Sequence, residues 1–149
     1  MAIPSLDLTV RPPRSPRVRL GGYVILPRML DKGRAVLNGK NGEYKYNCPM
    51  DQHFVNFVGV DPEGIRSQLQ AGKGDQEVLQ WIEGACKIKR QPHEIAAWSL
   101  YHEGRGPTDV ETRQFFTEQI QKYGPAREDI VGWFDLLDLD DYVSFGGRA

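Results

Sequence analysis

Apolar residues recur at helical spacing over most of the chain after residue 26. Val78, Ile82 and Ala85 stand at i, i+4 and i+7, which places them on one face of a helix. Similar stripes occupy positions 95, 98 and 102 and positions 116, 120 and 123. This pattern predicts amphipathic helices that bury one face each.

Start and stop signals set approximate bounds for these helices. Asp61-Pro62-Glu63 combines an N-cap, a first-turn proline and a first-turn acid, and the helix it begins should end near Gly72. The other predicted helices run from 27 to about 38, from 49 with Phe54, Phe57 and Val58 on one face, from a cap at Asp75, from Pro92, from a capping box at Thr108, and from about Arg127 with Ile130, Trp133 and Leu137 inward.

Seven short helices with tight connections indicate an all-α fold. None is long enough for a regular up-and-down bundle, so we expect an irregular compact bundle in a single domain, residues 23–149. Residues 39–47 form a polar connection in which Glu43–Tyr46 could pair as one short β-hairpin.

The first 22 residues have a different character. Pro12, Pro13 and Pro16 fix φ and remove amide donors, which predicts an extended arm close to polyproline II. With three residues per turn, Arg11, Arg14 and Arg17 would project from one edge.

Charge is unevenly distributed between the arm and the rest of the chain. The net charge is −1, yet residues 1–40 carry eight basic and two acidic residues, and residues 41–149 carry eleven basic and eighteen acidic ones. Opposite charges attract, so one interpretation is that the arm folds back as a strap onto its own acidic body.

The alternative interpretation is that the arm is a binding site. A row of guanidinium groups suits phosphates or carboxylates, and we expect Arg14, Arg17, Arg19 and Arg28 to hold an anionic small molecule or an acidic protein. The acidic remainder argues against nucleic acid as the partner. Tyr44, Tyr46 and Phe145 could instead form a homodimer face.

An enzyme is the second hypothesis, in two versions. Cys48 stands at a predicted helix start with His53 about one turn beyond it, an arrangement that could activate a thiol. Glu94 and His102 lie on one predicted helix and could act as an acid–base pair, although His102 also fits a core position.

Other chemistries lack their motifs. His93-Glu94 begins like H-E-x-x-H, but Ala97 stands where the second histidine is required. Gly72-Lys73-Gly74 lacks the earlier glycine and the following hydroxyl of a phosphate loop. We therefore expect no metal and no cofactor.

Two cysteines do not make a disulfide framework, and no signal peptide or apolar span is evident. These features lead us to expect a cytoplasmic protein that does not enter a membrane.

The proline-arginine opening and several later stretches resemble one family. The residues that carry the resemblance are Leu6–Thr9, Arg11–Pro16, Leu20–Tyr23, Leu26–Arg28, Asp31-Lys32, Gly39–Tyr44 and Asn47–Pro49. They are similar to a bacterial family catalogued as domain of unknown function 5069, and the resemblance spans the chain. Because that family has no established activity, the resemblance implies no site residue and no cofactor.

Overall fold

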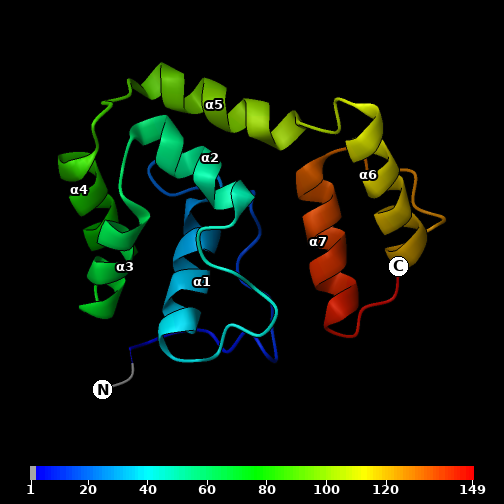
Figure 1. The fold of residues 1–149 in the computed structure, drawn as a ribbon, viewed down its shortest axis with the longest axis horizontal. Coiled ribbons are helices and arrows are strands. Elements are labelled where there is room, and N and C mark those ends of the chain that lie inside the picture. Colours follow the sequence, from blue (N-terminus) through cyan, green and yellow to red (C-terminus); the bar gives the residue numbers. More distant parts are fainter. Residues whose placement is uncertain (1–2) are drawn as a thin grey trace.

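The computed structural model describes residues 3–149, which form seven α-helices and no β-strand (Figure 1). The helices are α1 (Leu26–Leu37), α2 (Pro49–Val58), α3 (Pro62–Gln70), α4 (Asp75–Ala85), α5 (Pro92–Gly104), α6 (Val110–Tyr123) and α7 (Trp133–Ser144). The predicted all-α fold is confirmed. Residues 1 and 2 of the predicted arm lie outside the described residues.

The main core surrounds α1. Leu26, Met29 and Leu30 of this helix are fully buried, and they belong to one cluster with Phe54 of α2 and Ile65 of α3. Burial of a large apolar side chain is worth about 1.5–3 kcal/mol, so this cluster holds α1–α4 together. We call α1–α5 the helical body.

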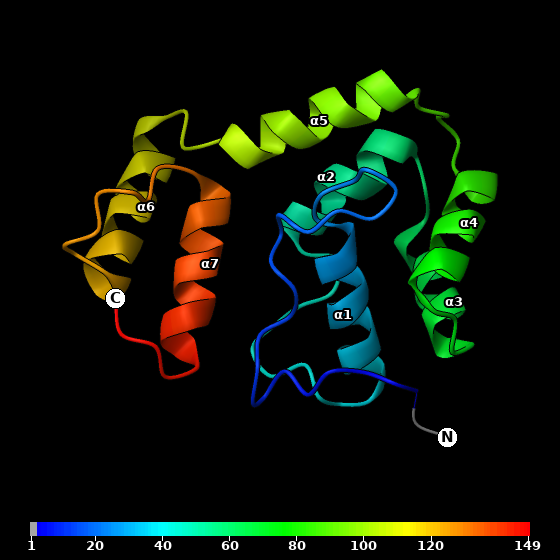
Figure 2. The ribbon, with the colours of Figure 1, turned by 180° about the vertical axis from the view of Figure 1, so that it is seen from behind.

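Helices α6 and α7 form a C-terminal hairpin beside that body. The hairpin has its own cluster of Phe116, Ile130, Leu136 and Leu139. Figures 1 and 2 show α5 extending across the top of the molecule, with α1–α4 beneath one end and the hairpin beneath the other.

A third cluster joins the body to the hairpin. It consists of buried Val24, Ile25 and Phe134, with Met50 and Trp98 packed against them. We call these five residues the junction. It fixes the hairpin to the segment between the arm and α1, and to α2 and α5.

The arm, residues 3–22, runs beside α1 on the side facing α7 (Figure 2). Backbone hydrogen bonds hold it at two points. The Leu8 N–H donates to the Lys40 carbonyl at 2.8 Å, and the Pro16 carbonyl accepts the Ile25 N–H at 2.9 Å. The prolines leave few amide donors, and the arm forms no helix.

Two predicted helix starts differ in detail. Asp109, not Thr108, caps α6, because its carboxylate accepts the Thr112 N–H at 2.7 Å. Gly74, not Asp75, is the N-cap of α4, because the Asp75 carboxylate faces Arg14 and Arg34 instead.

The last helix begins at Trp133 rather than near Arg127. Asp135 determines this start, since its Oδ2 accepts the N–H groups of Val131 at 3.1 Å and Gly132 at 2.9 Å. Ile130 lies before the helix and is nevertheless buried, whereas Leu137 is half-buried.

The short hairpin considered for Glu43–Tyr46 does not form; these residues make turns and extended backbone. Their side chains attach separately to other parts of the fold. The Tyr44 hydroxyl donates to Asp141 Oδ1 at 2.6 Å, and the Tyr46 hydroxyl donates to the Pro62 carbonyl at 2.6 Å.

Candidate functional site

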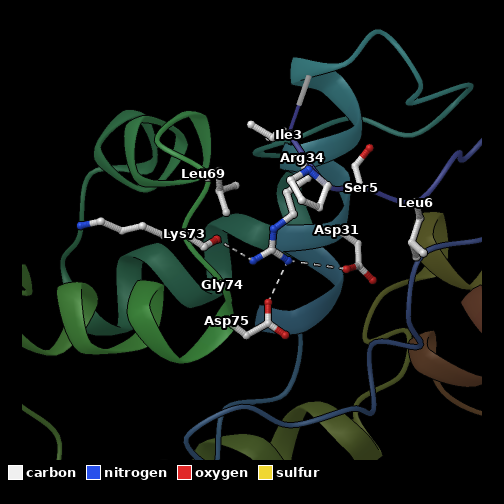
Figure 3. A pocket seen from close by; sticks show the side chains of 11 residues that line it. Ile3, Ser5, Leu6, Asp31, Arg34, Leu69, Lys73, Gly74 and Asp75 are labelled. Carbon is white, nitrogen blue, oxygen red and sulfur yellow. Dashed lines mark hydrogen bonds and ion pairs between the residues drawn. The ribbon is translucent and has the colours of Figure 1, made fainter. Parts of the chain in front are cut away.

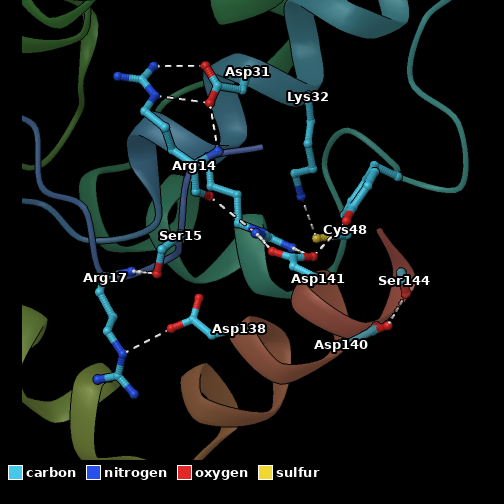
Figure 4. Close-up of polar contacts among 12 residues, drawn as sticks. Arg14, Ser15, Arg17, Asp31, Lys32, Cys48, Asp138, Asp140, Asp141 and Ser144 are labelled. Carbon is cyan, nitrogen blue, oxygen red and sulfur yellow. Dashed lines mark hydrogen bonds and ion pairs between the residues drawn. The ribbon is translucent and has the colours of Figure 1, made fainter. Parts of the chain in front are cut away.

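Arg14 connects the arm to two helices. Its Nη2 lies 2.9 Å from Asp31 Oδ1 on α1 (Figure 4). Its Nη1 lies 2.8 Å from Asp75 Oδ2 on α4. The Arg14 N–H also donates to Asp31 Oδ2 at 2.9 Å. Hydrogen bonding to Asp31 raises the pKa of Arg14 above its usual value despite partial burial. This arginine is committed to internal carboxylates.

Arg17 and Arg19 contact two other helices, α7 and α5. Arg17 pairs with Asp135 and, at 3.2 Å, with Asp138 of α7. Arg19 Nη2 lies 2.8 Å from Glu103 Oε1 of α5. Three of the four arginines predicted as ligand contacts therefore bind carboxylates of the protein's own helices.

Arg28 is the fourth, and it lies deeper. Its side chain is 5% exposed and pairs with Asp141 of α7, Nη1 to Oδ2, at 2.8 Å. Nη1 also donates to the Arg14 carbonyl at 3.2 Å, and the guanidinium lies over the Tyr44 ring. Burial and the nearby Asp141 raise the pKa of Tyr44. This network spans the gap between α1 and the hairpin.

A cleft of about 880 Å³ lies between the body and the hairpin at this network. Its lining residues come from the arm, α1, the 42–48 connection, α2, the end of α6, and α7 with the residue after it. They are Leu8, Thr9, Arg28, Lys32, Gly42, Glu43, Tyr44, Lys45, Cys48, Met50, Lys122, Tyr123, Leu137, Asp140, Ser144 and Phe145. Of the predicted arginines, only Arg28 lines it.

Lys32 and Cys48 lie side by side in the cleft wall. Lys32 is 4% exposed, and its Nζ donates to Cys48 Sγ at 3.1 Å and to Asp51 Oδ1 at 3.0 Å. Asp51 is fully buried and accepts the Cys48 N–H at 3.3 Å. Sequence reasoning missed Lys32, because a lysine on a helix usually belongs to its solvated face.

The predicted partner of Cys48 was His53, and within residues 3–149 no hydrogen bond joins them. His53 Nε2 instead lies 2.9 Å from Arg105 Nη1, and its ring is 4.9 Å from that of His102. Burial and Arg105 lower the pKa of His53. Lys32 occupies the place beside the thiol.

Glu94 and His102 are likewise engaged separately. Glu94 lies in the first turn of α5, where its Oε2 accepts the Gln91 N–H at 2.6 Å. His102 is buried near the other end of the same helix against Trp98, and burial lowers its pKa to about 4. His102 is a core histidine, as one interpretation of the sequence expected.

A smaller cavity, about 460 Å³, lies where the arm meets α1 and α4 (Figure 3). Arg34 crosses it, with Nη1 at 2.8 Å from Asp75 Oδ1 and Nη2 donating to the Lys73 carbonyl at 3.3 Å. The hydrogen bonds from Arg14 and Arg34 lower the pKa of Asp75 against the effect of burial. Asp31, Arg34 and Asp75 of this cavity pair with one another or with Arg14. The larger cleft is therefore the better candidate site.

Metal-ligating side chains are scattered over the part of the chain that the structure describes. Among residues 3–149, no three His, Cys, Asp or Glu side chains are grouped so that they could hold a metal ion. None of the helices there has the length and apolar content needed to cross a membrane.

Comparison with known proteins identifies the family. A family model described as a domain of unknown function, DUF5069, matches residues 10–143. The chain therefore belongs to this family, in agreement with the resemblance seen in its sequence. No curated protein matches the chain.

Proposed function

We propose that this protein binds a small organic anion in the cleft between the helical body and the C-terminal hairpin. The observation that supports this most directly concerns Lys45 and Lys122. They line the cleft from opposite walls, the 42–48 connection and the end of α6, and both are exposed. Neither side chain makes an ion pair within residues 3–149, so the ammonium group of each can pair with an anionic ligand.

Two other cations of the cleft are compensated by buried carboxylates. Arg28 pairs with buried Asp141, and Lys32 pairs with buried Asp51. Two carboxylates, Glu43 and Asp140, also line the cleft and make no ion pair within residues 3–149, although Asp140 accepts a hydrogen bond from the Ser144 hydroxyl at 2.8 Å. The ammonium group of Lys122 lies 5.0 Å from the centre of the Tyr123 ring. Two lysines without an ion-pair partner in the lining of one cleft are suited to a carboxylate or a phosphate.

The rest of the lining is suited to the body of such a molecule. Tyr44, Tyr123 and Phe145 supply aromatic surface, and Met50 and Leu137 supply aliphatic surface. Sites for small molecules combine a mostly apolar wall with a few placed polar groups, and this cleft is in their usual size range. An organic acid or phosphate ester fits both features better than an inorganic anion.

The arm then has a supporting role in this function. Arg14, Arg17 and Arg19 of the arm hold α1, α4, α5 and α7 in place and do not line the cleft, whereas Arg28 of α1 lies in its wall. The proposal also places the protein in the bacterial cytoplasm, a setting compatible with its two unpaired cysteines.

Thermal unfolding with a panel of carboxylates, nucleotides and sugar phosphates tests the proposal. A ligand at about 100 times its dissociation constant adds about 2.7 kcal/mol to the free energy of unfolding. We expect at least one organic anion to raise Tm in the natural protein, and Lys45→Gln with Lys122→Gln to abolish that rise.

Lys87→Gln is the matched control, because Lys87 is exposed on the body outside the cleft and its loss should leave the rise intact. A rise that survives the double cleft variant, or that disappears equally in the Lys87 variant, contradicts the proposed site.

A further inference from the structure

The contact between Lys32 and Cys48 goes beyond what anion binding requires. Nζ and Sγ are 3.1 Å apart, and the two residues come from the middle of α1 and the residue before α2. Cys48 is half-buried and lines the cleft, so a small solute can reach its sulfur. At this distance, an oxygen added to the sulfur would lie within bonding reach of the Lys32 nitrogen.

Asp51 fixes this pair in position. Its carboxylate lies 3.0 Å (Oδ1) and 2.9 Å (Oδ2) from Lys32 Nζ and accepts the Cys48 N–H at 3.3 Å. Because Asp51 and Lys32 are both buried, the amine cannot turn away from the sulfur into solvent.

The second cysteine has a different environment and serves as an internal comparison. Cys86 is half-buried too, but its sulfur donates only to the Glu83 carbonyl, at 3.6 Å. Within residues 3–149, no lysine or arginine donates to it. Both thiols are free, so the chain contains one thiol with an amine partner and one without.

We propose that Lys32 and Cys48 are a peroxide-sensitive pair that closes into a covalent nitrogen–oxygen–sulfur bridge. In the first step the Cys48 sulfur attacks hydrogen peroxide: an S–O bond forms, the O–O bond breaks, and one water leaves with the thiol proton, giving the sulfenic acid. Lys32 reacts as a neutral amine, and the extra proton of its ammonium leaves to water in the cleft.

A second hydrogen peroxide completes the bridge. An N–O bond forms between Nζ and the sulfenic oxygen, and the peroxide O–O bond breaks. The hydroxyl hydrogen of the sulfenic acid and one amine hydrogen leave in two molecules of water. The pair thus loses four electrons to two peroxides and gains one oxygen in exchange for two hydrogens.

The spacing favours this bridge over a direct nitrogen–sulfur bond. One oxygen bonded to both atoms spans most of the present gap, whereas a direct bond would draw together two side chains held in a close-packed region. The bridge ties α1 to the start of α2 and removes the ammonium charge of Lys32 from the cleft wall. The further expectation that it weakens anion binding rests on the proposed function.

The test is mass spectrometry of the natural protein after graded exposure to hydrogen peroxide. We expect the intact mass to rise by one oxygen less two hydrogens and to return to its original value with dithiothreitol. Peptide mapping should place the cross-link between Lys32 and Cys48. Free thiol should disappear severalfold faster at Cys48 than at Cys86.

Variants separate the bridge from simple thiol oxidation. Cys48→Ser should abolish the cross-link and Cys86→Ser should retain it. Lys32→Arg keeps a cation beside Asp51 but lacks the primary amine, so Cys48 should continue to higher oxidation states. Lys45→Arg changes another lysine of the same cleft and should leave the bridge intact.

The proposal is overturned if Cys86 loses its thiol as fast as Cys48, or if Cys48 is oxidised with no link to Lys32. The peptide map of the natural protein decides this even if Lys32→Arg fails to fold. Because the readout is a covalent bond, it stands apart from the anion-binding result: a bridge without ligand-induced stabilisation removes the proposed function and leaves this inference standing.

Discussion

His102 lies inside the body among groups that oppose its protonation. Its ring packs 4.6 Å from that of Trp98 and 4.9 Å from that of His53, and its Nδ1 is buried with no hydrogen-bond partner within residues 3–149. Burial lowers its pKa to about 4, and the charges of His53 and Arg105 act in the same direction. The neutral ring is therefore part of the native packing.

This environment predicts a loss of stability in mild acid. A histidine in the unfolded chain has a pKa of about 6.5, so between that pH and about 4 the unfolded state binds a proton that folded His102 does not. Stability therefore rises with pH in this window, and acidification across it should cost about 2–3 kcal/mol. Urea unfolding at a series of pH values measures the slope.

His102→Phe should remove most of this dependence of unfolding free energy on pH. The smaller part that remains should be due to His53, whose pKa is lowered by burial and Arg105. Exposed His93 offers the control, since His93→Gln should leave the slope unchanged. An undiminished slope in His102→Phe would assign the acid sensitivity to other groups.

At the scale of elements, the arm acts through arginines of unequal strength. Arg14 holds Asp31, whose side chain is only 6% exposed, whereas Arg17 holds Asp135 and Asp138 in a more exposed setting. A buried carboxylate that loses its partner keeps its desolvation cost, but an exposed pair is worth little and is screened by salt.

We therefore expect Arg14→Ala to destabilise the fold by about 2–4 kcal/mol and Arg17→Ala by about 0–1 kcal/mol. Only the Arg17 effect should fall as salt rises. Denaturant unfolding at low and moderate salt measures both, with Arg11→Ala, an exposed arm arginine, as the control. Equal costs for Arg14 and Arg17, or loss of anion binding in Arg17→Ala, would contradict a strapping role for Arg17.

The sequence predicted the elements well where local signals decide. Proline and acid signals placed the starts of α2, α3 and α5 correctly, because caps act within one turn. The start of α7 was predicted too early, near Arg127. It depends on the hydrogen bond from the Gly132 N–H to the Asp135 carboxylate, and the residues before it also have a helical pattern. The arm's charge asymmetry predicted a strap, and in the structure Arg14 of the arm pairs with Asp31 of α1.

The cleft could not be predicted in the same way, since it depends on contacts distant in sequence. Lys32 and Cys48 come from different segments of the body, and Lys122 joins them in one cleft only when the hairpin packs against the body. The buried pair of Arg28 with Asp141 joins residues 113 positions apart. Neither periodicity nor a short motif reports such a pairing.

At the scale of the molecule, the junction determines how the hairpin is held. Phe134 of α7 is 1% exposed and packs with Val24 and Ile25. Ile25 has a φ of 75°, a left-handed conformation that a β-branched residue rarely adopts. The Pro16 carbonyl accepts its N–H, and the surrounding packing maintains this conformation. The segment that follows the arm, α2 and the hairpin therefore meet at this junction.

Phe134→Ala should loosen the hairpin before the rest of the molecule. Truncation of a buried phenylalanine costs about 3–5 kcal/mol, and the Phe134 ring is part of the packing that joins the hairpin to the body. Hydrogen exchange should accelerate more in α6 and α7 than in α1, and the anion-dependent rise in Tm should shrink, since Tyr123 and Leu137 line the cleft.

Phe54→Ala in the main core is the comparison, and it should accelerate exchange in α1 and α2 instead. If Phe134→Ala accelerated exchange uniformly, the hairpin and body would unfold as one cooperative unit, and the cleft could not open by movement of the hairpin alone.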